Sequence, residues 1–152
     1  MRNFNVYTGS VGWEHASWND GFYPDDLPED WQLSFYNTQF HCVYLPHLVW
    51  YQASNDLVAA WLNEAQEDFH FVLGIPDRRP GDWSEKAARF GNRGKLEDEV
   101  EVVWLGAQTS LRELAGQLKQ SSEMRRSLYL IAKSDGLAQL RQIGELIEVM
   151  GV

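Results

Sequence analysis

The chain has 152 residues, of which 44% are hydrophobic, so we expect one folded domain over residues 1–152 with a sizeable core. A net charge of −9 argues against a nucleic-acid partner, because binding to a phosphate backbone depends on clustered Lys and Arg side chains. Without a long apolar run or a signal-peptide pattern, the sequence predicts no membrane partner and a cytoplasmic protein. The single cysteine, Cys42, is expected to be a buried apolar residue.

Hydrophobic periodicity predicts five short strands that alternate with helices, which is typical of a parallel α/β sheet. The strands are expected at residues 4–8, 41–45, 69–73, 100–105 and 128–132. Helices are expected from about residue 28, after Ser54 as an N-cap, around 111–118 and over 136–150. Their inward positions are predicted as Trp31, Phe35 and Tyr36, then Leu57, Ala60 and Trp61, then Leu111, Leu114 and Leu118, and finally Leu140, Ile143 and Ile147.

An irregular connection at about residues 74–99 interrupts this alternation. It contains an uncertain helix around 83–90 and, between residues 77 and 95, six basic and three acidic side chains. A patch for a phosphorylated or acidic partner is one interpretation. A solvated connection is the other, and we favour it because long polar segments between elements are usually loops.

The opening motif carries the clearest resemblance to a known family. Gly9-Ser10-Val11-Gly12-Trp13 is followed by Trp18 and by Phe22-Tyr23-Pro24. This pattern resembles the YecE-like family, also called domain of unknown function 72, which is TIM-barrel-like. The segments 102–106 and 129–135 resemble the last two units of that family more weakly.

Most polar positions of the family pattern are replaced in this chain. His15 stands for a tyrosine, Tyr44 for a glutamate, Pro46 for an asparagine, Gly74 for a lysine, Val103 for an arginine and Leu105 for a histidine. The Gly, Trp and Pro scaffold is kept while the polar groups are lost. The resemblance therefore implies a shortened, degenerate member that acts as a non-catalytic binding or protein-interaction module.

A closed barrel of this type takes about 250 residues, so the chain is short by roughly three β/α units. We expect a truncated TIM-barrel-like parallel sheet of about five β/α units, or alternatively an open doubly wound sheet. The missing units would fall near residues 74–99. Because a partial barrel exposes strand edges, we also expect a two-fold homodimer that uses the segment around 83–90.

Ligands of such folds sit at the carboxyl ends of the strands. The alternative function is therefore a residual enzyme or a binder of a sugar- or nucleotide-like small molecule. Its ligand-binding residues would be Ser10, Trp13, His15, Trp18, Tyr23, His47 and Trp50. The other interpretation, which we favour, is that Trp13, Trp18 and Phe22 plug the end of a small core.

The catalytic candidates are weak, and comprise His15, Asp77 and Asp135. His41, His47 and His70 have no ligand-like spacing, so no metal site is expected. No cofactor is expected either.

Overall fold

The computed structural model describes residues 6–106, 108–124, 126–133 and 136–151. Its strands are β1 (Val6–Ser10), β2 (Cys42–Leu45), β3 (His70–Leu73), β4 (Gly94–Leu96), β5 (Val102–Leu105) and β6 (Leu128–Ala132). Its α-helices are α1 (Gln32–Gln39), α2 (His47–Gln52), α3 (Asn55–Glu64), α4 (Trp83–Ala88), α5 (Leu111–Met124) and α6 (Leu137–Met150). Short 3₁₀ turns are η1 (Ala16–Asp20), η2 (Glu29–Trp31) and η3 (Gly91–Arg93).

All strand pairs are parallel, which confirms the α/β class. They form two three-stranded sheets, in the orders β1-β6-β5 and β2-β3-β4. The sheets meet where β1 runs beside β2, with a bridge between Val11 and Tyr44 and a 3.0 Å hydrogen bond from the His41 amide to the Thr8 carbonyl. Among the described strands β4 pairs only with β3 and β5 only with β6, so these strands form no closed barrel.

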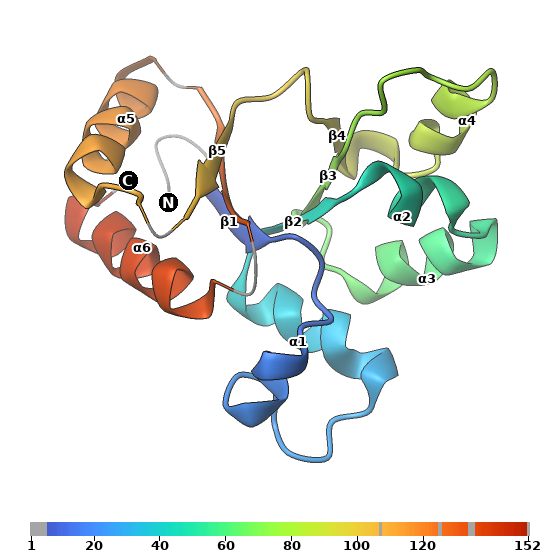
Figure 1. Ribbon diagram of the computed structural model, residues 1–152, viewed down its shortest axis with the longest axis horizontal. Helices are drawn as coiled ribbons and strands as arrows, with labels where there is room; N and C mark the ends of the chain where they lie inside the picture. Colours follow the sequence, from blue (N-terminus) through green and yellow to red (C-terminus); the bar gives the residue numbers. More distant parts are fainter. Residues whose placement is uncertain (1–5, 107, 125, 134–135, 152) are drawn as a thin grey trace.

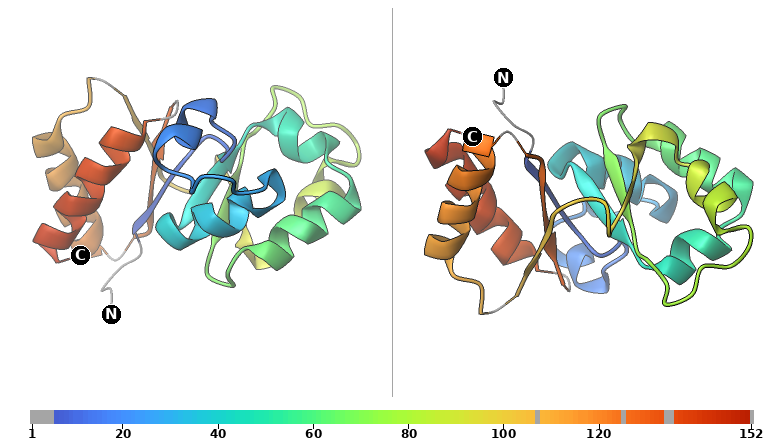
Figure 2. Two further views of the ribbon diagram at one scale, coloured as in Figure 1. Left: turned by 90° about the horizontal axis from the view of Figure 1, so that it is seen from below. Right: turned by 90° about the horizontal axis from the view of Figure 1, so that it is seen from above.

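The helices surround the strands on three sides. Figure 1 shows α5 and α6 on one side, α1 below and α2, α3 and α4 on the other side, and the views of Figure 2 agree. The connection of residues 97–101 crosses the remaining side, between β4 and β5. Both sheets are open, but among the described residues the inner cluster contains no helix residue, so the helices pack on one face of the strands and not on both faces as in a doubly wound sheet.

The two faces of the strands have separate cores, because successive side chains of a strand point to opposite faces. On the outer face Val43, Phe71 and Leu130 are buried against the helices. On the inner face Cys42, Val72, Tyr129 and Ile131 form a second buried cluster, which contains no helix residue. Cys42 is fully buried, as predicted, and burial raises the pKa of its thiol.

Several helix details differ from the predicted stripes. Ser54 does cap α3, since its Oγ accepts a 3.1 Å hydrogen bond from the Leu57 amide. However, Leu57 and Ala60 are exposed, and the inward stripe consists instead of Val58 and Trp61. Trp31 is 63% exposed because it belongs to η2, whose three residues per turn take it off the buried face of α1. Leu111 of α5 is also exposed, whereas the other expected residues of α5 and α6 are at least partly buried.

The segment 74–99 is more ordered than expected. It contains α4, whose Trp83 is buried, and β4, which extends the β2-β3 sheet with Gly94 opposite Phe71. A sixth strand was missed because its three residues carry no hydrophobic alternation. Helix α2 lies between the strand expected at 41–45 and the helix expected after Ser54, where no helix was predicted.

Basic side chains of this segment cap neighbouring helices. Arg89 donates to the carbonyls of Trp50 (2.8 Å) and Ala53 (2.7 Å), in the last turn of α2 and at its C-cap residue. Arg93 donates to Leu62 (2.9 Å) and other carbonyls at the end of α3. These carbonyls have no partner within their own helices, so the arginines satisfy them. This structural role accounts for part of the local positive charge without an acidic partner.

Candidate functional site

The carboxyl ends of β2, β3 and β4 bring together a small polar group that we call the strand-end site: Tyr44, Gly74 and Glu97. The Tyr44 hydroxyl donates a 2.8 Å hydrogen bond to Glu97 Oε1. The Ile75 amide donates to the same oxygen over 3.4 Å. Burial, followed by the hydrogen bond to Glu97 and its charge, raises the pKa of Tyr44, so the phenol stays protonated and holds the carboxylate.

Gly74 is required by the position of Tyr44. A Cβ at residue 74 would lie 2.6 Å from the Tyr44 hydroxyl and 3.0 Å from the His47 amide nitrogen. The tyrosine therefore occupies the space in which a larger side chain at residue 74 would begin. The family pattern has a glutamate at the position of Tyr44 and a lysine at the position of Gly74. In this chain the two replacing residues fit one another.

A second group lies at the end of β1 and involves Ser10, His15 and Tyr36. The Ser10 amide donates to the Tyr36 hydroxyl (2.8 Å), which donates to the Cys42 carbonyl (2.7 Å). Ser10 Oγ donates to the Gly12 carbonyl over 2.7 Å, whereas His15 Nε2 lies 3.4 Å from Ser10 Oγ. The serine proton is thus directed to a backbone carbonyl rather than to the imidazole. This arrangement holds the turn after β1, and the Gly12 carbonyl, which lies 3.3 Å from His15 Nε2, is shared by the serine and the histidine.

Four of the predicted ligand-binding aromatic residues are buried in the core: Trp13, Trp18, Tyr23 and Trp50. Tyr23 donates a hydrogen bond to the Trp13 carbonyl, and Trp50 donates through Nε1 to the Gly74 carbonyl over 3.1 Å. The polar atoms of Tyr23 and Trp50 are therefore engaged in positioning segments of the chain itself. His15 is partly exposed and its ring lies 4.3 Å from that of Trp18.

The other predicted site residues lie apart. His47 stacks on Tyr51 at 5.0 Å, and burial lowers the pKa of its imidazole. Its Nε2 is buried and has no hydrogen-bond partner among the described residues. Asp77 is exposed, without a hydrogen bond or an ion pair to another described residue. Asp135 lies outside the described residues.

The three histidines considered as metal ligands have different surroundings. His41 lines an outer cavity, His47 packs on Tyr51, and His70 belongs to the inner face. Within the part of the chain that the structure describes, no three His, Cys, Asp or Glu side chains are grouped to hold a metal ion.

The inner face holds an aromatic stack that the sequence did not reveal. Tyr7 stacks on His70 (4.3 Å) and on Tyr129 (4.7 Å), and the Tyr129 hydroxyl is 2.8 Å from His70 Nδ1. Burial and the nearby charge of Lys95 lower the pKa of His70 to about 4, against a smaller opposing effect of Asp68. The imidazole is therefore neutral at pH 7. The pairing of β1 with β6 and the approach of β3 from the other sheet bring these rings together, and no local sequence pattern predicts that.

The fold and the strand-end site define an α/β protein with parallel strands and helices on one face of them. Residues 7–79 match the family described as protein of unknown function DUF72, so this part of the chain belongs to that family.

The structure is similar to the crystal structure of a DUF72 family protein from Thermotoga maritima, with a TM-score of 0.62 and 12% sequence identity. The match covers 95% of this chain and 99% of that chain. At this identity the likeness concerns the fold alone. No curated protein matches the sequence. Of the helices described, none is long and apolar enough to cross a membrane.

Proposed function

We propose that the chain is a non-catalytic DUF72 member that acts as a binding or protein-interaction module. The observation that carries this proposal is the fit between Tyr44 and Gly74. The tyrosine hydroxyl fills the space beside the glycine and is held by Glu97. A substitution that had only removed a catalytic group would leave a gap, whereas this pair is packed and hydrogen-bonded.

The other replaced positions support the same proposal. Pro46 is the N-cap residue of α2 and Leu105 is buried in the outer core. Val103 packs against that core. None of these side chains can transfer a proton, so their contribution is to folding.

The alternative is a residual enzyme or a binder of a sugar- or nucleotide-like molecule, which would use His15, Asp77 and Asp135. Its support is that Ser10 and His15 approach each other at the end of a strand, where ligands of this fold class bind. The burial of Trp13, Trp18, Tyr23 and Trp50 weighs against it, because these rings could stack on a ligand only after leaving the core.

A direct test uses AMP, glucose and N-acetylglucosamine as probes, titrated into ¹⁵N-labelled protein and its His15→Ala variant. Because the proposal excludes the aromatic loops as a ligand site, we expect no saturable shifts of their amide signals with millimolar probe. Saturable binding to the native chain that is lost in His15→Ala would overturn the proposal in favour of the alternative.

We further infer that the fold is a shortened TIM-barrel-like arrangement, with the missing units between β4 and β5, and that two chains pair through these strand edges. We also propose that the protein is located in the cytoplasm. Trp83 and Phe90 are buried within their own chain, so the interface is assigned to the edges rather than to α4. A specific interface should bury more than ~1,000 Å² in total. Light scattering after size exclusion should give twice the mass of one chain, and a monomer at micromolar concentration would contradict the pairing.

A further inference from the structure

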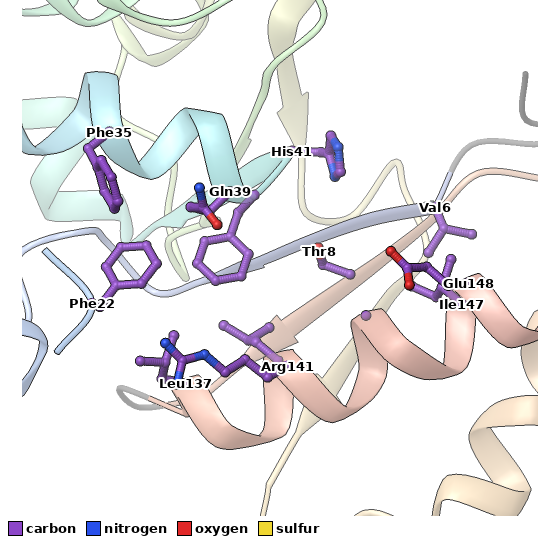
Figure 3. A pocket seen from close by; sticks show the side chains of 13 residues that line it. Val6, Thr8, Phe22, Phe35, Gln39, His41, Leu137, Arg141, Ile147 and Glu148 are labelled. Atoms are coloured by element: carbon purple, nitrogen blue, oxygen red, sulfur yellow. The ribbon is translucent and has the colours of Figure 1, made fainter.

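A cavity of about 360 Å³ lies on the outer face of β1, between α1 and α6 (Figure 3). Val6 and Thr8 of β1 line it beneath the two helices. It is separate from the strand-end site, which lies at the carboxyl ends of β2, β3 and β4. Its volume falls within the range of small-molecule sites.

Gly144, in the middle of α6, keeps this cavity open. A Cβ at this position would meet no other atom within 4 Å, and Gly144 itself lines the cavity. Glycine inside a helix lowers helix stability relative to alanine, and no close contact requires it here. The residue therefore leaves room next to β1 at a cost to the helix.

The lining combines apolar walls with five polar or charged side chains, those of Thr8, Gln39, His41, Arg141 and Glu148. Phe22, Phe40 and Leu140 contribute rings and an aliphatic side chain. Arg141 is the one cation of α6 and makes no hydrogen bond or ion pair with another described residue. Figure 3 shows its side chain extending toward the Phe22 end of the cavity.

We propose that this cavity binds a small monocarboxylic acid with an apolar body. Arg141 would hold the carboxylate, because a guanidinium donates two parallel hydrogen bonds to such a group. The apolar body would lie against the phenylalanine rings and Leu140. Glu148 lines the cavity two helical turns further along α6, so a second carboxylate at that end would be repelled.

The experiment uses 3-phenylpropionate as the probe and its neutral amide, 3-phenylpropanamide, as the matched comparison. Each is titrated into ¹⁵N-labelled full-length protein while the amide signals of Thr8 and Gly144 are followed. We expect saturable binding of the acid at least five-fold tighter than that of the amide. In Arg141→Gln the acid should lose this advantage while the amide binds as before.

Gly144→Met tests the location, because Gly144 lines the cavity and a Cβ at this position meets nothing within 4 Å. It should abolish binding of the acid, with a melting temperature equal to or above that of the native chain. Gly116→Met is the control: it makes the same change at an exposed position of α5, where a Cβ also meets nothing within 4 Å, and it should leave binding unchanged. The proposal is overturned if the acid does not bind, if the amide binds equally well, or if binding survives in folded Gly144→Met.

Discussion

The two flanks of the strands are covered in different ways. On the side of α2, α3 and α4, the rings of Trp50 and Trp83 pack edge to face at 5.5 Å, and arginines bond to the ends of the helices. On the side of α1 and α6, a cavity is left beside Gly144. The comparison teaches that large rings and long cationic side chains fill the space on the first side. On the second side, Gly144 and Thr8 leave space open.

The largest expected effect comes from removing Arg89, which lies on the side of α2, α3 and α4. Arg89 donates to the Trp50 and Ala53 carbonyls and to Asn55 Oδ1, so Arg89→Met leaves several acceptors without a donor. Because hydrogen bonds to charged groups contribute most, we expect the free energy of unfolding to fall by about 3 kcal/mol in urea titrations.

The matched control for this change is Arg78→Met. Arg78 is exposed and makes no hydrogen bond or ion pair with another described residue, so its replacement should cost less than about 0.5 kcal/mol. Equal losses in the two variants would show that the hydrogen bonds of Arg89 do not contribute specifically to the free energy of unfolding.

The next effect concerns the junction of Tyr44 with Gly74. Gly74→Ala places a Cβ 2.6 Å from the tyrosine hydroxyl and close to two backbone atoms, and we expect a loss of about 2 kcal/mol. Tyr44→Phe removes the hydroxyl, so the double variant should be less destabilised than the sum of the single variants. Strict additivity in thermal unfolding would contradict the fit on which the proposed function depends.

A pH effect is expected from the inner face, which both flanks share. Folding lowers the pKa of His70 to about 4, compared with about 6.5 in the unfolded chain, so acid favours the unfolded state. Stability from this group is complete above about pH 6.5 and is lost as the pH falls toward 4. After allowance for partial exposure we expect a loss of about 1–2 kcal/mol.

The comparison variant for this effect is His70→Gln, which cannot titrate. Carboxylates also protonate in this range, but their contribution cancels in the difference between the two unfolding curves measured at each pH. A difference that does not change between pH 7 and pH 4.5 would refute the role of His70. The native chain and the variant share the groups around residue 70, namely Tyr7, Tyr129, Lys95 and Asp68.

Much of the fold could be predicted from the sequence because strands such as β2 and β6 are dense apolar runs between turns. The Ser54 cap was also readable, since it depends on local chemistry. The missed elements, β4 and α2, are short and owe their existence to pairing and packing with distant segments. Local patterns carry little information about such elements.

The candidate site was less predictable. The motif predicted Ser10 and the tryptophans in the loop after the first strand, but Ser10 is the last residue of β1 and Trp18 lies in η1. Aromatic residues after a strand serve a core as readily as a ligand. Glu97 lies in an acidic run that resembles solvated surface, and only the register of β3 with β4 places it beside Tyr44. The outer cavity depends on two helices separated by about 100 residues, and no local pattern predicts it.

The smallest effect is expected on the side of α1 and α6, where the cavity lies, and it increases the free energy of unfolding instead of lowering it. Gly144→Ala adds a methyl group that meets nothing within 4 Å and removes the conformational cost of glycine in a helix, so α6 should gain about 0.5–1 kcal/mol. Gly9→Ala is the contrasting change, because its Cβ would collide with the Cys42 carbonyl where β1 passes β2. It should destabilise the chain. If Gly144→Ala also destabilised the chain in urea titrations, the space beside Gly144 would already be filled. The two sides of the molecule would then not differ in packing.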